Sequence, residues 1–469
     1  MKPAGFMLLE ELRLLWRDGH VTWALAAFMV LTIVAAANGR ALLEMQRATA
    51  EALQGESREL IDALAVQAER GVDAATSAGS AGFSVLHLPL VLPAAPVSPL
   101  AIGMHDLLPS HYEVTARGAH VFLGQTELDS PLRLSLGNFD VAFVIVWLLP
   151  LVVIGLMFNV VSAERERGVL ALAVAAGRNP RRFVLGKCLA RLVTLLAALW
   201  VSLLVSAGVA GVPLGRVEGL WLYAGWLCGA TLYALFWFAL ALLVNSRAAT
   251  SDRNAATLIA AWLLLVILAP ALTNLVATTA FPAPSRVDLT TELREATEQA
   301  DRDAAATRDR YFFDHPDMQG QDMDRNEYFR SVASSEAAIA RSMLPLLARF
   351  ETQAERQQSI VEALQYLSPG TLSWQLLTGL SGSDGARHRE FRAQALRFHK
   401  QWVKFFVSRL EANQPLARAD YAALPRFEFL EPPVTMSLRR AAGPVGVLAL
   451  MVLLICGWAL RRLGHLAVS

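Results

Sequence analysis

Long uncharged stretches divide the chain and indicate where it crosses a membrane. A bilayer-spanning helix needs about 20 mainly apolar residues with few charges. Six stretches qualify, each free of Asp, Glu, Lys and Arg: residues 19–39, 141–163, 192–215, 219–246, 254–285 and 441–460. A soluble protein could bury one or two such helices, but not six. The sequence therefore predicts an all-α polytopic membrane protein with transmembrane helices at 20–39, 141–163, 186–213, 219–245, 254–281 and 441–460.

A seventh uncharged stretch, residues 74–104, contains Pro89, Pro93, Pro96 and Pro99. Each proline removes a helical hydrogen bond that lipid cannot replace, so we interpret the stretch as a loop. The first stretch could instead be a cleaved signal peptide, but about 20 residues that include acidic ones precede it, which favours an uncleaved anchor. Residues 1–19 predict an amphipathic interfacial (elbow) helix, with a cytoplasmic extension of the first span, broken at Gly19, as the alternative.

Lysine and arginine near the ends of the spans set the expected orientation, because these residues stay on the cytoplasmic side. An orientation with both termini inside keeps these residues in the cytoplasm: Lys2, Arg13, Arg17, Arg165, Arg167, Arg178, Arg181, Arg182, Lys187, Arg191, Arg247, Arg253, Arg461 and Arg462. The short external loop holds only Arg216, and Arg439 and Arg440 follow a long external segment. We expect a cytoplasmic loop at 164–185, a cytoplasmic tail at 461–469, and two large extracytoplasmic insertions at 40–140 and 282–440.

The two insertions carry mainly helical patterns. Apolar residues at helical spacing predict helices over 42–70, 289–313, 327–367, 372–380 and 387–410. A short strand pair is expected at 112–115 and 120–123, around Gly118. We expect these helices to bundle outside the membrane.

Composition supports a membrane protein and excludes other classes. Hydrophobic residues make up 54% and charged residues 18% of the chain, and mean hydropathy is +0.39. Because 42 basic residues face 41 acidic ones, no overall basic field would attract nucleic acid. Cys188, Cys228 and Cys456 form neither a disulfide framework nor a metal motif.

The signatures of common enzymes are missing. Gly186-Lys187 is the one Gly-Lys pair, and it lacks the glycine and the hydroxyl residue of a nucleotide-binding loop; HExxH and GxSxG motifs do not occur. Histidines and acidic residues gather at 105–111 and 314–327, but the calcium-loop glycine is absent there and we interpret both groups as solvated loops, with no metal site. The sequence therefore predicts no catalytic residues.

The loop after the second span carries the most informative motif. Glu164, Arg165, Glu166, Arg167 and Gly168 form a dense run of alternating charge, and a short apolar helix with Leu170 follows before a break at Gly177 and Pro180. An ordinary positive-inside loop would explain the arginines. It would not explain the two glutamates or the ordered helix and break, so we interpret the segment as an amphipathic helix whose charges bind a cytoplasmic partner.

This loop and the segments around it resemble those of a known family. Residues 139–151, the run 162–168 and Gly186-Lys187 are similar to the second span and coupling helix of ABC-2 type permeases. The closer match is the subfamily labelled domain-of-unknown-function 3526, to whose external motifs the segments 99–109 and 367–375 are similar.

The resemblance implies a permease subunit in the bacterial inner membrane, paired with itself or a sister permease and driven by a separate cytoplasmic ATPase. That ATPase, not this chain, would use ATP and magnesium; this chain would bind no cofactor. ATPase coupling is expected at Glu164, Arg165, Glu166, Arg167, Gly168 and Leu170, and the substrate path at Asp140, Pro150, Asn159, Pro270 and Asn274.

Family analogy favours export. One alternative is an ATP-driven transmitter that acts on periplasmic partners without moving a substrate. A secondary transporter is disfavoured because the spans hold almost no ionisable residue for coupling to ions.

Overall fold

The structure is a computed structural model that describes residues 19–103, 108–118, 139–169, 180–247, 249–282 and 325–463, parts of 291–306, and the single residues 11, 13, 172 and 175. Within these ranges six helical segments are long and apolar enough to cross a membrane: Gly19–Glu69, Val141–Glu166, Arg181–Ala210, Val217–Asn245, Ser251–Ala280 and Val434–Leu463. The prediction of six apolar helices of spanning length is confirmed. The expected elbow helix lies almost wholly outside the described residues.

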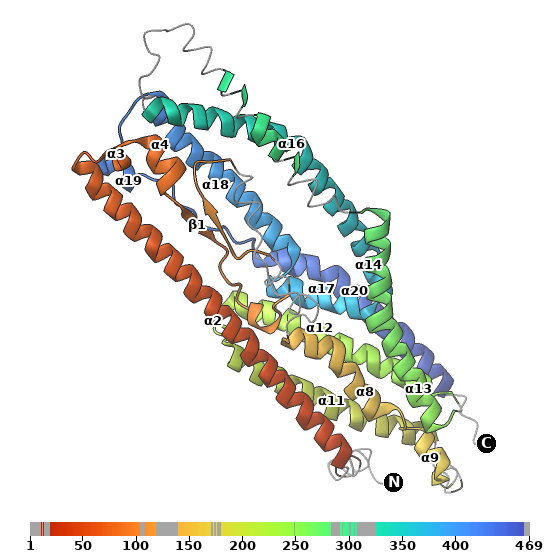
Figure 1. Cartoon of the computed structure of the whole chain (residues 1–469). Helices are drawn as coiled ribbons and strands as arrows, with labels where there is room; N and C mark the ends of the chain where they lie inside the picture. The colour runs from red at the N-terminus through yellow and green to blue at the C-terminus, as the bar shows by residue number, and fades with distance from the viewer. Residues whose placement is uncertain are drawn as a thin grey trace, which may run out of the picture.

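These segments pack side by side as one bundle, which we call the apolar bundle (Figure 1). It comprises the first half of α2 (Gly19–Glu69), the run α7 (Val141–Phe143), η3 (Val144–Leu148) and α8 (Leu149–Met157), then α11 (Pro180–Ala210), α12 (Val217–Asn245), the run α13 (Ser251–Trp262), η4 (Leu263–Leu268) and α14 (Ala269–Ala280), and α20 (Val434–Leu463). α8 and α12 form its centre, where Val153, Trp226 and Trp237 are fully buried. By contrast, α13, α14 and α20 expose most of their apolar side chains, as helices surrounded by lipid do.

Helix α2 extends far beyond the bundle. Its 51 residues correspond to roughly 75 Å, more than twice the thickness of the hydrocarbon layer. The sequence predicted two helices here, at 20–39 and 42–70, and the structure joins them without a break. At Gly39 the backbone of Pro99 lies directly against the helix, because a Cβ atom there would overlap the carbonyl group of Pro99. The far half of α2 therefore carries the first insertion as a direct continuation of a span.

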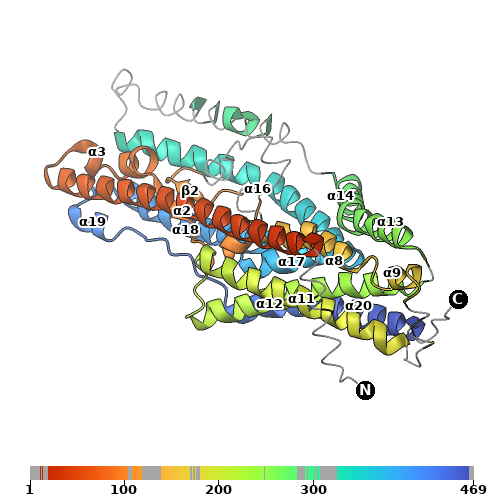
Figure 2. The ribbon, with the colours of Figure 1, turned by 90° about the horizontal axis from the view of Figure 1, so that it is seen from below.

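The far ends of α2 and α16 (Arg325–Leu364) meet α18 (Gly385–Glu411) in a second body, the distal domain (Figures 1 and 2). Its smaller elements are α3 (Asp73–Thr76), α4 (Ala78–Ser80), η1 (Ala81–Val85), β1 (Leu88–Val91), β2 (His111–Val114) and α19 (Arg418–Ala422). A separate hydrophobic core, with Phe83, Phe391, Trp402 and Phe406 buried, holds it together. Both insertions supply this core, so they form one domain.

The small sheet of the distal domain differs from the prediction. β2 contains the expected strand residue Tyr112, which pairs with Leu90 of β1 in an antiparallel ladder. β1 lies in the stretch that we had interpreted as a proline-rich loop, and Pro89 fits there because one edge of a two-stranded sheet needs no N–H donor. The expected partner strand at 120–123 lies outside the described residues.

Helix α17 (Pro369–Ser381) corrects the expectation that all helices of the second insertion bundle away from the membrane. It packs into the apolar bundle against α12 and α20, with Leu372, Leu376 and Leu377 buried. A Cβ atom at Gly229 of α12 would lie 2.8 Å from Leu376 Cδ2, so glycine permits this close approach. Ser368 comes directly before α17. Its Oγ atom donates to the carbonyl oxygen of Leu265 at 2.6 Å, near the middle of the segment 251–280. Residues 363–383 are also uncharged, but Ser, Thr, Gln and Gly make up 11 of these 21 residues, so the stretch is not mainly apolar and was not expected to cross a bilayer.

Candidate functional site

The expected coupling segment is a short helix, α9 (Ser162–Glu166), which follows α8 after one irregular turn. It lies at the end of the apolar bundle opposite the distal domain, together with the first residues of α2 and the last residues of α20 (Figure 1). Gly168 has a φ of +71°, a left-handed conformation that favours glycine, and it ends the helix. Leu170 lies outside the described residues.

Glu164 connects α9 to the start of α11. Its Oε1 atom lies 2.7 Å from Lys187 Nζ, and the two side chains are only 13% and 16% exposed. Lys187 also lies 3.4 Å from Glu11 Oε2, and Arg191 Nη1 donates to Asn159 Oδ1 at 3.2 Å. These partly buried charges satisfy one another, and charge-assisted bonds in such a setting are strong. The network therefore fixes the end of the second span against the start of the third.

Glu166 connects α9 to the start of α13. Its Oε1 accepts a hydrogen bond from the backbone N–H of Ser251 at 2.7 Å, and its Oε2 accepts one from Ser251 Oγ at 3.0 Å. Ser162 Oγ lies 2.8 Å from Ser251 Oγ as well. A carboxylate at a helix N-terminus satisfies free N–H groups and interacts favourably with the helix dipole. Through one five-residue helix, the second span is thus bonded to both the third and the fifth.

The two arginines of the motif differ in exposure: Arg165 is half-buried and Arg167 is exposed. Within the described part of the chain, the side chains of Arg165 and Arg167 make no hydrogen bond or ion pair. Val169 and Leu172, which follow them, are 38% and 74% exposed. The sequence motif therefore has two halves: its glutamates bind the chain itself, whereas Arg167 and the adjoining apolar residues form an exposed surface at the end of the bundle, with the half-buried Arg165 beside it.

Asp140, an expected substrate-path residue, is fully buried and its carboxylate is occupied. Its Oδ1 accepts from the backbone N–H of Phe143 at 2.7 Å, which caps α7, and its Oδ2 accepts from the N–H of Ile102 at 2.8 Å. Asp140 therefore fastens the loop at 98–102 to the start of the second span. Asn159 sits at the other end of that span, where it binds Arg191.

Pro150 and Pro270 each follow a π-helical turn, η3 and η4 respectively. Proline has no N–H, so it leaves carbonyl groups in the preceding turn without their helical partner. Side chains from other elements bond to these turns: Tyr233 Oη donates to Val146 O at 2.8 Å, and Ser368 Oγ donates to Leu265 O. Asn274 is exposed on α14. The five expected path residues thus lie at separate places along two spans and do not form one site.

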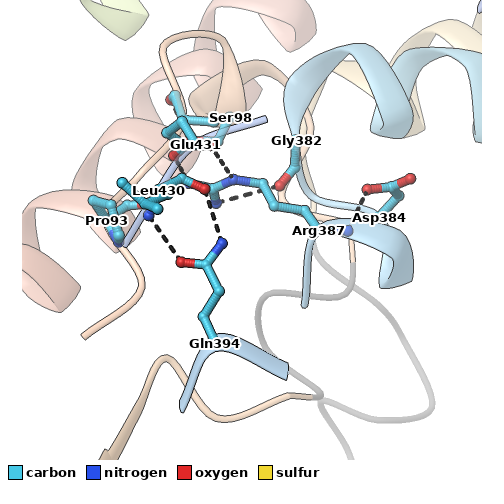
Figure 3. Close-up of polar contacts among 9 residues, drawn as sticks. Pro93, Ser98, Gly382, Asp384, Arg387, Gln394, Leu430 and Glu431 are labelled. Carbon is cyan, nitrogen blue, oxygen red and sulfur yellow. Dashed lines mark hydrogen bonds and ion pairs between the residues drawn. The ribbon is translucent and has the colours of Figure 1, made fainter. Parts of the chain in front are cut away.

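Sequence reasoning missed a junction around Arg387, where the distal domain meets the bundle (Figure 3). The buried guanidinium donates to both carboxylate oxygens of Glu431, with Nε 3.1 Å from Oε2, and Nη2 donates to Pro93 O at 2.6 Å. Gln394 binds the backbone N–H and C=O of Leu430, both at 2.9 Å. The two side chains hold the linker that leads into α20 against α18 and the first insertion.

An open cavity of about 840 Å³ lies beside this junction. It is bordered by the starts of α12, α18 and α20, by the last turns of α16, and by α17. Its apolar lining includes Leu222, Trp374, Leu376, Leu380, Ala441 and Pro444. Its charged lining includes Glu218, Glu362, Asp384, Arg389 and Arg440, besides the Arg387–Glu431 pair. Burial raises the pKa of Asp384, while its bond to the Arg387 backbone N–H and the charges of Arg440 and Arg389 act in the opposite direction.

Comparison with protein families gives one match. Residues 286–430 match the family described as a domain of unknown function (DUF3526). This segment runs from the end of the fifth apolar helix through α16, α17 and α18 to the linker at Leu430, so it holds Ser368, Arg387 and most of the cavity wall contributed by the second insertion. No curated protein matches the chain.

Proposed function

We propose that the chain is the transmembrane permease subunit of an ATP-driven exporter in a bacterial inner membrane, paired with a second permease and driven by a separate cytoplasmic ATPase. The six apolar helices and the match over residues 286–430 support this proposal, as does the resemblance of the 162–168 segment to a coupling helix. The observation that carries it is the arrangement at α9, where the exposed Arg167 and the half-buried Arg165 adjoin glutamates bonded to two other spans.

In this proposal the two halves of the motif have different tasks. Arg165, Arg167 and the exposed Val169 contact the ATPase. When nucleotide binding moves the ATPase subunits together, α9 moves with them. Glu164 passes this movement to α11 through Lys187, and Glu166 passes it to α13 through Ser251. Because an ion pair and a doubly hydrogen-bonded cap resist separation, the spans follow α9 rather than release it.

The test is to co-express the chain with candidate cytoplasmic ABC-type ATPases of the same organism and to measure complex formation by pull-down. We expect the double substitution Arg165→Glu and Arg167→Glu to abolish the complex, because it reverses the charge of the exposed surface. Arg216→Glu is the matched control, since Arg216 is also exposed but lies in the loop at the other end of the bundle. Loss of the complex in the control, or its retention in the double variant, would refute the assignment of the surface.

A second experiment addresses the glutamates. We expect Glu164→Gln with Glu166→Gln to leave the complex intact but to lower ATP hydrolysis stimulated by substrate or lipid in nanodiscs, because neutral amides weaken the bonds to Lys187 and Ser251. Unchanged stimulation would show that movement does not pass through these bonds.

A second candidate function is force transmission to periplasmic partners without transport. The unbroken helix α2 favours it, because a single rigid element joins a span to the distal domain. Transport by proteoliposomes containing the ATPase complex distinguishes the two functions: a permease moves a compound across the bilayer, whereas a transmitter hydrolyses ATP with no compound moved.

A further inference from the structure

The cavity beside the Arg387 junction crosses the level at which the spans begin. At the start of α20 the last charged residue is Arg440, and the uncharged run begins at Ala441. At the start of α12 the same change falls between Glu218 and Gly219. Lining residues lie on both sides of this level, with charges on one side and Leu222, Leu376 and Pro444 on the other. Trp221, adjacent to the lining residue Leu222, is 60% exposed on the outer face of the bundle. The cavity therefore has a charged part and an apolar part and borders the lipid-facing surface.

The charges of the cavity separate by element. Arg389 and Arg440 come from the starts of α18 and α20, and Glu218 and Glu362 come from α12 and the end of α16. Within the described part of the chain none of these four forms an ion pair, whereas Arg387 and Glu431 bind each other. Asp384 lies close enough to Arg389 and Arg440 for their charges to act on its carboxylate, and Glu362 Oε1 accepts a hydrogen bond from Gln358 Nε2 at 3.0 Å. A ligand group that entered would thus meet two arginines with one carboxylate, Asp384, on one pair of helices, which leaves a net positive charge, and two carboxylates, Glu218 and Glu362, on another pair.

Two aromatic residues complete the lining. Trp374 of α17 and Tyr366, which is 40% exposed, line the cavity, and both follow Glu362 closely in the sequence. Aromatic faces attract ammonium groups, most strongly when a carboxylate lies nearby and water is partly excluded. Guanidinium groups match phosphate geometry and bind it through two hydrogen bonds.

We propose that this cavity binds one single-chain amphiphile with a zwitterionic phosphate–ammonium head group. The phosphate lies at Arg389 and Arg440, the ammonium lies toward Glu218, Glu362 and the aromatic residues, and the hydrocarbon chain lies along Leu222, Leu376 and Leu380. The volume of about 840 Å³ agrees with one such molecule, since pockets of about 300–1,000 Å³ enclose ligands of drug size. As a substrate site the cavity rests on the proposed function; binding itself does not.

The test uses the purified full chain in a maltoside detergent. The probe is lysophosphatidylcholine that carries a photoreactive diazirine in its acyl chain, with lysophosphatidylglycerol and monoacylglycerol of the same chain as comparison probes. We expect saturable labelling of peptides from residues 218–225, 372–380 and 441–448 by the zwitterionic probe, with weaker labelling by the anionic and the uncharged ones. Labelling spread evenly over the exposed helices α13 and α14, or stronger labelling by the anionic probe, would overturn the proposal.

Substitutions identify the head-group contacts. We expect Arg389→Ala with Arg440→Ala to weaken binding about tenfold or more, because charge-assisted hydrogen bonds to phosphate are lost. Arg439→Ala is the matched control: Arg439 is the exposed neighbour of Arg440, it does not line the cavity, and its removal should change binding less than about twofold. The melting temperature of each variant reports whether the fold is retained, and Glu362→Gln provides a second, milder variant.

An equal loss of binding in Arg439→Ala and in the double variant Arg389→Ala with Arg440→Ala would overturn the proposal. The outcome is independent of the ATPase: binding without complex formation would sustain the site and refute the permease proposal, and complex formation without binding would do the reverse.

Discussion

At the scale of single residues, the prolines of the second and fifth spans show how the apolar bundle satisfies its backbone. Pro150 and Pro270 remove N–H groups from the interior of two helical segments of the apolar bundle, and each is preceded by a π-helical turn. Tyr233 and Ser368 supply hydroxyl donors to carbonyl groups of these turns. An unpaired carbonyl in such surroundings costs free energy, so these hydroxyls stabilise a backbone that the prolines would otherwise weaken. Each of these turns is thus bonded to a side chain from another part of the fold.

The Tyr233 hydroxyl provides a direct test. We expect Tyr233→Phe to lower the free energy of unfolding by about 1–3 kcal/mol, because Val146 O loses its donor in a buried site. Tyr223→Phe is the matched control on the same helix, since the Tyr223 hydroxyl makes no hydrogen bond within the described residues, and it should change stability by less than about 0.5 kcal/mol. Thermal unfolding of both variants in the same detergent measures the difference. Equal stability of the two variants would contradict the assigned role.

Among helices, α17 shows where sequence patterns stop being sufficient. Its spacing of leucines predicted a helix at 372–380, and the structure has one at 369–381. The pattern did not tell which surface those leucines would cover, because burial against α12 depends on the absence of a side chain at Gly229, more than 140 residues earlier in the chain. The role of Ser368 could not be predicted either, because its partner is a backbone carbonyl, which carries no sequence signal.

The placement of α17 can be tested by cysteine accessibility. In a variant lacking the three native cysteines, we expect Ser373→Cys to resist a membrane-impermeant maleimide, because Ser373 is fully buried between α17 and its neighbours. Ser408→Cys, on the exposed face of α18, should react rapidly in the same vesicles. Mass spectrometry after labelling measures both. Comparable reaction at the two positions would place α17 at the surface of the distal domain.

Over the whole molecule, two hydrophobic cores lie at opposite ends, one in the apolar bundle and one in the distal domain. The long uncharged stretches predicted the core of the apolar bundle, because a helix in lipid must be apolar in composition. The second was only partly predictable: the helices of both insertions were expected, but not that residues 60–116 and 391–429 pack on each other. Contacts such as Tyr421 Oη to Ala75 O at 2.6 Å join segments separated by about 350 residues, a distance over which periodicity gives no information.

Separate cores imply separate unfolding. Trp402→Ala removes a fully buried side chain from the distal core and should cost about 3–5 kcal/mol. We expect hydrogen–deuterium exchange to rise in segments 64–116 and 391–429 and to stay unchanged in 141–160 and 222–244, because cooperative units open independently. Trp200→Ala, at an exposed position on α11, is the control. An equal rise throughout the chain would mean that the two bodies unfold as one.

The uninterrupted course of α2 has a geometric consequence. A straight helix of this length converts a small change of tilt into a large displacement: pivoting by 5° about its first turn would carry its last turn sideways by about 6–7 Å. Adjustments of a few degrees among the packed helices of the apolar bundle would therefore be amplified into shifts wider than the spacing of two strands, about 4.8 Å, at the far end of the distal domain.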